Sequence, residues 1–280
     1  MSRDAGDGDG RAVALRAIYD ELAACPDLRP GPVVDDAFER LVRLAVDTPH
    51  DEAAAVLAHG AVRDVVDDLR ALCYEGEVQL EAAWAGRIAD SDDPGAELER
   101  FPFAANYRRL HEMEREAVAR LAEGDARRDG GRVAFVGSGP LPLTAFLFAA
   151  TGVRVDNLDR DAGALAASRR VADALGVSGL EFVHADATVA GTTLDGYDLV
   201  VLAALVGRTP AEKTRVIARL AEAMTPGSIL LVRSAHGLRT LLYPAVDLGA
   251  LAGFEVLGTV HPTGEVINSV IVARTPAKVR

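Results

Sequence analysis

The sequence is poor in cysteine, basic charge and long apolar runs, and each shortage excludes a class of protein. Cys25 and Cys73 are its only two cysteines in 280 residues, too few for a disulfide-stapled scaffold. Lys and Arg number 30 against 42 Asp and Glu, which argues against nucleic acid as the main partner, because phosphate binding needs clustered basic residues. No uncharged apolar stretch reaches the roughly 18 residues of a membrane-spanning helix. The polar opening MSRDAGDGDGR is not a signal peptide, so we expect a soluble, cytoplasmic protein with no membrane partner.

The first half of the chain carries an apolar pattern typical of helices. Apolar residues recur at helical spacing at Val62, Val65, Val66, Leu69 and Leu72, and again at Leu110, Met113, Ala117 and Leu121. The polar stretch EGDARRDGG (123–131) interrupts this pattern and is typical of a linker. We therefore predict a disordered tail over 1–10, an N-terminal helical domain over 11–125 and a second domain over 126–280.

The second half alternates short apolar runs with helical patterns. Strands are predicted at 132–136, 153–158, 180–184, 198–203, 228–233, 254–261 and 266–273, and helices near 141–150, 161–175, 210–224 and 238–251. This alternation favours a mainly parallel sheet covered by helices on both faces. Only HPTGE joins the last two strands, which is too short for a helical crossover, so they should form an antiparallel hairpin at the sheet edge. Such an α/β sheet of seven strands resembles the Rossmann-like class I methyltransferase fold.

Three features of this half coincide with strand ends, where ligands bind in open α/β sheets. Gly137 and Gly139 follow the first strand and let a ligand approach the backbone. Asp159 closes the second strand, where a carboxylate can accept both hydroxyls of a ribose. Asp186 follows the third strand and is placed to accept from an adenine amino group. Together they predict an adenosine-bearing ligand.

The glycine loop GSGPLPLT (137–144) separates two candidate ligands. Pro142 stands where a dinucleotide-binding loop has its third glycine. Pro140 and Pro142 also remove two N–H donors at the helix end where a pyrophosphate would bind. S-adenosylmethionine, which has no phosphate, therefore fits better than NAD or FAD. The predicted cofactor-binding residues are Gly137, Ser138, Gly139, Pro140, Asp159, Asp186, Ala187 and Ala203.

Several longer stretches resemble the nicotianamine synthase family. The closest are FVGSGPLPLT (135–144), LAALVG (202–207), RSAHGLRTLLYPAVD (233–247) and GFEVLGTVHPTGEVINSVIVAR (253–274), with looser matches at EVQLEAAW (77–84) and FPFAANY (101–107). The resemblance covers about residues 65 to 275. It implies transfer of the 3-amino-3-carboxypropyl arm of S-adenosylmethionine to an amine, with release of methylthioadenosine. In nicotianamine itself it implies successive transfers and a ring closure.

This chemistry needs neither a metal nor a covalent nucleophile, because the sulfonium is already an activated leaving group. The acceptor amine must lie in line with the arm's terminal carbon, and a base must take its proton. The resemblance implies that Glu81 and Tyr107 are catalytic, with Glu81 as the base or the ammonium anchor. Tyr74 and Glu77 share a helical face with Glu81. The predicted substrate-binding residues are Tyr74, Glu77, Asn106, Arg233 and His236.

Individual roles stay open at this level. Arg233 could clamp a carboxylate, His236 could be a base or cap a turn, and Tyr243 should pack the following helix. Phe103 and Ala104 stand where plant members of the family carry aromatic hydroxyls, which leaves the acceptor and the number of transfers open. The six histidines and two cysteines show no metal-ligand spacing.

Four functions compete on this sequence. The leading hypothesis is a nicotianamine synthase-like aminocarboxypropyl transferase that makes a nicotianamine-type or opine-type metallophore. The second is intramolecular cyclisation of S-adenosylmethionine to azetidine-2-carboxylate. An ordinary methyltransferase is disfavoured by the loop and the C-terminal blocks, and a non-catalytic adenosine-binding module by Glu81 and Tyr107. A homodimer is an open alternative to a monomer.

Overall fold

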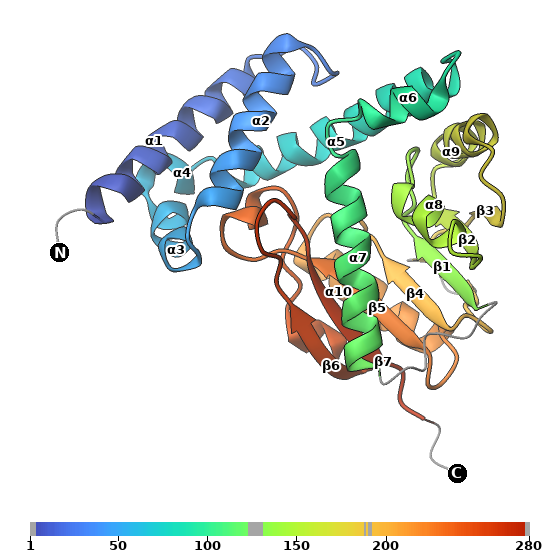
Figure 1. The fold of residues 1–280 in the computed structure, drawn as a ribbon. Helices are drawn as coiled ribbons and strands as arrows, with labels where there is room; N and C mark the ends of the chain where they lie inside the picture. The colour runs from blue at the N-terminus through green and yellow to red at the C-terminus, as the bar shows by residue number, and fades with distance from the viewer. Residues whose placement is uncertain (1–3, 123–130, 188, 190–191, 278–280) are drawn as a thin grey trace.

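The N-terminal half is helical in the computed structural model, which describes residues 4–122, 131–187, 189 and 192–277 (Figure 1). Its helices are α1 (Asp4–Ala23), α2 (Pro32–Asp47), α3 (His50–Ala58), α4 (Gly60–Arg63), α5 (Val66–Ala89), α6 (Pro94–Glu99) and α7 (Ala104–Leu121). In α2, Pro32 begins the first turn, where its missing N–H has no cost, and Val34, Ala37, Leu41 and Ala45 form the buried stripe.

Helix α1 differs from the prediction of a disordered tail over 1–10, because it already begins at Asp4. Its buried face starts at Ala12 and continues through Leu15 and Leu22, while Arg11 forms an ion pair with Glu52 in α3. Once packing holds this amphipathic part, each further residue adds a backbone hydrogen bond without a new nucleation cost. The helix therefore extends into a segment that is polar by composition.

The second half contains the predicted seven-stranded sheet. Its strands are β1 (Arg132–Val136), β2 (Arg154–Asp159), β3 (Leu180–His184), β4 (Leu199–Leu202), β5 (Ile229–Ser234), β6 (Glu255–Val260) and β7 (Ser269–Arg274), in the order β3-β2-β1-β4-β5-β7-β6. The first five strands pair in parallel, and β7 pairs antiparallel with both β5 and β6. This order confirms the class I methyltransferase-like sheet and its antiparallel hairpin at the edge.

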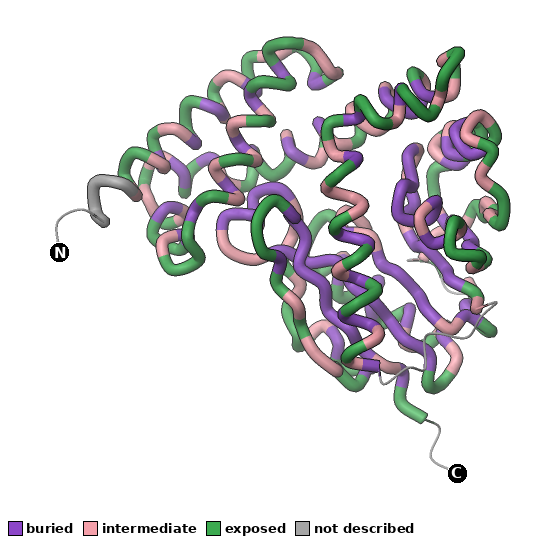
Figure 2. The backbone as a smooth tube through the Cα atoms, in the orientation of Figure 1, coloured by how far each residue is buried: buried purple, intermediate pink, exposed green. Residues whose placement is uncertain are grey.

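Helices cover both faces of the sheet. Helix α10 (Pro210–Ala223) packs behind it, and α7 lies in front of it (Figure 1), with α8 (Leu143–Ala149) alongside. The central strands are consequently buried along their length (Figure 2). Helix α9 (Ala162–Leu175) lies against α5. Since α7 and α5 come from the helical half, the two halves of the chain share their packing.

The predicted helix over 238–251 is wrong. Two short 3-10 helices, η1 (Gly237–Leu241) and η2 (Leu248–Leu251), stand there instead. Pro244 explains the break, because it cannot donate a backbone hydrogen bond and disfavours helical backbone at Tyr243. Leu238 and Leu241 of η1 pack into the core of the helical half. Across the described residues, none of the helices combines the length and apolar content needed to cross a bilayer.

Candidate active site

The glycine loop and Asp159 meet at the carboxyl ends of β1 and β2, as predicted. Gly137 and Gly139 have φ angles of 79° and 67°, a left-handed backbone that favours glycine. The Asp159 carboxylate accepts the Gly139 N–H at 2.8 Å and the Asp161 N–H at 2.9 Å. A Cβ on Gly137 would lie 2.0 Å from Val206 Cγ2, so the loop after β4 packs directly on the glycine loop. Ser138 is buried, and within the described structure its Oγ has no hydrogen-bond partner.

Helix α5 brings Glu81 to this loop from the other half of the chain. A Cβ on Gly139 would lie 2.8 Å from Glu81 Oε2, so only glycine leaves room for the carboxylate. The other oxygen, Oε1, accepts the Tyr107 hydroxyl of α7 at 3.0 Å. The two residues predicted to be catalytic are therefore in direct contact, beside the loop predicted to hold the ligand.

A second carboxylate and tyrosine lie next to the first pair. Glu77 is one helical turn before Glu81 on α5, and the Tyr243 hydroxyl lies beside its carboxylate, where it lowers the carboxyl's pKa. The prediction that Tyr243 only packs a following helix is therefore wrong. The short η1 helix ends at Leu241, and the chain after it directs the tyrosine to α5. No sequence pattern indicated this contact.

Burial and mutual repulsion make both carboxylates weak acids. Burial raises the pKa of Glu77 to about 7 from 4.5. Burial, and then the nearby charges of Glu77 and Asp159, raise the pKa of Glu81 well above its ordinary value. Burial and the glutamates likewise raise the pKa of Tyr107 and Tyr243, so both phenols stay protonated donors. Both carboxyls are therefore harder to ionise than an exposed glutamate.

Arg233 is the buried positive charge beside these carboxylates. Its guanidinium donates from Nε to Glu114 Oε1 at 2.7 Å and from Nη2 to Glu114 Oε2 at 3.2 Å, and Nη2 also donates to the Thr144 hydroxyl. Glu114 and Thr144 are fully buried. The fork that sequence reasoning offered to a substrate carboxylate is thus engaged by Glu114. An arginine in the apolar strand ILLVRS needs a buried acid, and this was the signal that could have revealed Glu114.

Two cavities meet at the carboxylates. A chamber of about 720 Å³ lies between α2, α5, the turn before α7 and the segment before β7, and a cleft of about 60 Å³ lies at the glycine loop. Both are lined by Glu77, Glu81, Tyr107, Tyr243 and Asn268. Asn268 is buried, and its amide nitrogen lacks a hydrogen-bond partner among the described residues. Sequence reasoning missed Asn268, since it lies within a block that reads as an edge hairpin.

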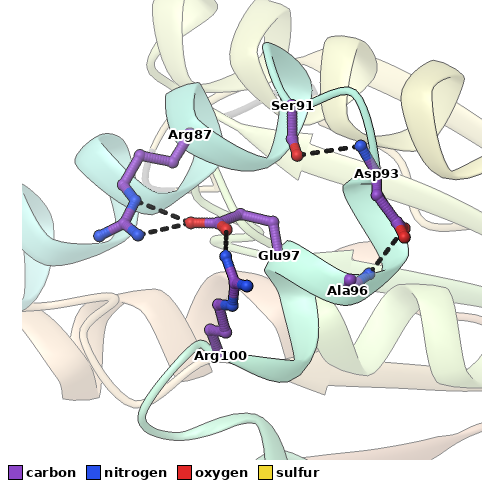
Figure 3. A network of polar contacts seen from close by, with 6 residues as sticks. All are labelled: Arg87, Ser91, Asp93, Ala96, Glu97 and Arg100. Atoms are coloured by element: carbon purple, nitrogen blue, oxygen red, sulfur yellow. Dashed lines mark hydrogen bonds and ion pairs between the residues drawn. The ribbon is translucent and has the colours of Figure 1, made fainter.

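A network of polar contacts lies between the end of α5 and the end of α6 (Figure 3). Glu97 of α6 accepts from Arg87 Nε at 2.9 Å and from Arg100 at 3.0 Å, and the Asp93 side chain caps α6 at the Ala96 N–H. This turn leads to Phe101, whose ring packs edge-on against Trp84 at 5.6 Å and lies 6.3 Å from Tyr107. The network therefore joins the end of α5 to the start of α7.

Two of the predicted substrate-binding residues, Tyr74 and His236, lie outside the chamber and the cleft. Tyr74 stacks under the Arg208 guanidinium at 4.0 Å and lines neither of the two cavities. His236 likewise lines neither cavity, and its Nδ1 hydrogen-bonds Ser269 at 3.0 Å. Its side chain does not cap η1, and burial lowers its pKa to about 4.

The remaining predicted residues are divided between several places. Asn106 lines the chamber and donates to the Glu265 carbonyl at 2.6 Å, while Ala203 lines the cleft. Ala187 lines a separate cavity of about 130 Å³ on the α10 side of the sheet. Asp186 is half-buried, and Pro140 lies in the turn between the glycines and α8. In the described parts of the chain, no cluster of His, Cys, Asp or Glu side chains is arranged to hold a metal ion.

The fold and site together define an enzyme of the class I methyltransferase-like group in which two carboxylates face the nucleoside loop. The family model "Nicotianamine synthase protein" matches residues 12–280. Nicotianamine synthase 2 of Oryza sativa subsp. japonica is 40% identical over 270 residues, which cover 93% of this chain and 81% of that protein. Nicotianamine synthase 9 of Hordeum vulgare is also 40% identical, covering 94% and 77%. The chain belongs to the nicotianamine synthase family.

Solved structures agree with this assignment. A glutamate-to-glutamine variant of MtNAS in complex with S-adenosylmethionine is 26% identical with a TM-score of 0.79, covering 95% of this chain and 98% of that one. MtNAS in complex with MTA and tNA is 26% identical with a TM-score of 0.80, covering 93% and 96%. Membership confirms the predicted class of enzyme, an S-adenosylmethionine-dependent aminocarboxypropyltransferase.

Proposed function

We propose that this protein is a nicotianamine synthase, which joins aminocarboxypropyl arms of S-adenosylmethionine and releases methylthioadenosine. The observation that carries this proposal is the contact between Gly139 and Glu81, because it places a carboxylate against the loop that would hold the nucleoside. The relatives support nicotianamine as the product. They give no support to an opine-type product or to release of azetidine-2-carboxylate.

The residues at the strand ends suit S-adenosylmethionine as the substrate. Asp159 offers a carboxylate for the ribose, the glycines leave the backbone open, and the buried Ser138 hydroxyl lacks a partner within the described chain. The cleft of about 60 Å³ is smaller than the roughly 300–1,000 Å³ of most ligand sites. The chamber of about 720 Å³ has room for an acceptor.

The chemistry follows from the position of the carboxylates between cleft and chamber. An acceptor amine in the chamber attacks the terminal carbon of the arm, the C–S bond breaks, and its electron pair stays on the sulfur of methylthioadenosine. Glu81 takes the proton that the amine loses, and Tyr107 holds that carboxylate in place. The positive sulfonium disappears as the proton arrives, so the net charge of the buried site does not change.

Product analysis tests this function. The purified protein is incubated with S-adenosylmethionine. The nucleoside and amino-acid products are then separated and identified by mass spectrometry. We expect methylthioadenosine together with nicotianamine. S-adenosylhomocysteine as the nucleoside product would overturn the proposal in favour of methyl transfer. Cytoplasmic localisation and a homodimer stay predictions from the sequence, and light scattering on the purified protein tests the second.

A further inference from the structure

The second carboxylate–tyrosine pair has no role in a reaction with a single base. Glu77 and Tyr243 line the same two cavities as Glu81 and Tyr107. The two glutamates lie four residues apart on one face of α5. Placing two carboxylates together out of bulk water is costly, because each opposes ionisation of the other. Packing alone would be served better by an apolar or amide side chain. Such an arrangement in a cavity indicates a chemical task for both groups.

Repeated transfer creates that task. Each new N–C bond releases one proton from the attacking amine, and in this enclosed site the carboxylate that accepts it becomes neutral. A neutral Glu81 cannot accept a second proton until it loses the first. An adjacent carboxylate provides the second acceptor without any rearrangement of the chain.

The two pairs also face different walls of the site. Tyr107 belongs to α7, which covers the sheet, whereas Tyr243 follows η1, which packs against α2, α3 and α5. Glu81 touches the glycine loop at Gly139, and Glu77 lies one turn earlier in α5, near Cys73 and Gly76 of the chamber wall. An amine bound beside Cys73 and Gly76 therefore lies nearer to Glu77 than to Glu81.

We propose that Glu77, held by Tyr243, is a second general base that takes the proton in a later N–C bond formation than the one served by Glu81. The step is balanced: the amine nitrogen bonds to the arm's terminal carbon, the C–S electron pair leaves on sulfur, and the proton goes to the Glu77 carboxylate. The substrate at this base is the amine of an intermediate that already carries an aminocarboxypropyl unit. This inference rests on the proposed function, because it requires more than one transfer.

The test compares Glu77→Gln and Tyr243→Phe with Glu81→Gln, and uses Glu75→Gln as a matched control. Glu75 lies on the exposed side of the same helix, where it accepts from Gln79 at 2.8 Å. With enzyme in excess over S-adenosylmethionine, we expect Glu81→Gln to slow release of the first methylthioadenosine about 100-fold or more, and Glu77→Gln to slow this first release far less than Glu81→Gln does.

With S-adenosylmethionine in excess, the Glu77→Gln protein should accumulate an intermediate with fewer aminocarboxypropyl units, and final product should fall about 100-fold. Tyr243→Phe should show the same intermediate with a smaller loss, and it keeps both glutamates if Glu77→Gln does not fold. An unchanged product pattern in either folded variant would overturn the proposal. Loss of the first methylthioadenosine in Glu77→Gln would overturn it too, since both glutamates would then serve one step.

Measurements on the unsubstituted protein distinguish failure of the second-base proposal from failure of the proposed function. If it releases no methylthioadenosine, the proposed function itself fails. If it releases methylthioadenosine but adds only one arm, the transferase activity stands and the second base is overturned. Binding of S-adenosylmethionine and circular dichroism, measured on every variant, show that each protein tested is folded and binds its substrate.

Discussion

Two charged clusters lie side by side in this protein, one buried and one half-buried, and they differ in how their charges are compensated. Arg233 and Glu114 form a two-pronged ion pair, with Thr144 completing the hydrogen bonds. Glu77 and Glu81 carry the same charge, each lies beside a tyrosine hydroxyl, and both line the two cavities, while the nearby Arg233 charge is already paired with Glu114. The first cluster is compensated internally. The second is left for a cationic substrate to compensate.

This contrast shows how a fold separates structure from chemistry within one site. A compensated pair fixes the geometry of β5, α7 and α8, because its atoms satisfy one another and cannot move independently. An uncompensated pair holds its protons more tightly than exposed carboxyls do, and a sulfonium brought next to it lowers the cost of ionisation. A glutamate is thus part of the rigid framework when it pairs with Arg233, and a candidate base when it lies beside a second glutamate.

The largest expected effect comes from the uncompensated cluster. Glu81→Gln keeps the shape of the side chain but removes the base, so turnover should fall by about 10²–10⁴-fold. Binding of S-adenosylmethionine should survive, and the free energy of unfolding should stay the same or rise slightly, because a repulsive neighbour of Glu77 is removed. Methylthioadenosine release and urea denaturation measure the two quantities. Near-normal turnover would remove Glu81 from its catalytic role.

The compensated cluster should respond in the reverse way. Glu114→Gln leaves the buried Arg233 charge without its partner, which should lower the free energy of unfolding by about 3–5 kcal/mol. The double change Arg233→Met with Glu114→Leu removes both charges and should recover most of that loss. Urea denaturation of the three proteins decides the point. If Glu114→Gln lowered the free energy of unfolding by less than about 1 kcal/mol, the Arg233–Glu114 pair would not be the compensated, stabilising cluster described here.

The sheet side of the site could be predicted from sequence, and the chamber side could not. The glycine loop and Asp159 were found because strand ends of a parallel sheet gather at one edge, whatever the details of packing. Glu81 and Tyr107 came from the family resemblance, since their contact with the loop depends on how α5 lies over the sheet. No local pattern carries that information.

Tyr243 and Asn268 show where local reasoning ends. The block containing Tyr243 looked like an ordinary helix, and only Pro244 hinted that the chain would break there and redirect the tyrosine. Asn268 directly precedes β7, and its place on two cavities depends on the pairing of β7 with β5. Tyr74 lies outside both cavities, because a helical face is broader than the cavity it borders. In all three cases the position depends on contacts between distant segments.

The pH dependence of the free energy of unfolding is a further way to distinguish the two clusters. The pKa of Glu77 is raised to about 7 in the folded protein, from an ordinary value of 4.5. Between these values the folded protein holds more protons than the unfolded chain, so the free energy of unfolding should fall as pH rises from about 4.5 to 7. Below that window this contribution vanishes. Urea denaturation across the window should show a shallower fall in Glu77→Gln, and an unchanged fall in Glu75→Gln. Equal slopes in both variants would contradict the assignment.

The smallest effect is expected at the turn before α7, where Glu97 is paired with two largely exposed arginines. Arg100→Ala removes one of the two guanidinium partners of Glu97 and keeps Arg87 on the other oxygen (Figure 3). Both arginines are largely exposed to solvent, so the free energy of unfolding should drop by no more than about 1 kcal/mol. Turnover should fall less than about threefold, because Phe101 still packs on Trp84 and keeps Tyr107 in place. A loss of turnover as large as that of Glu81→Gln would mean that this turn controls the base directly, which the exposed position of Arg100 argues against.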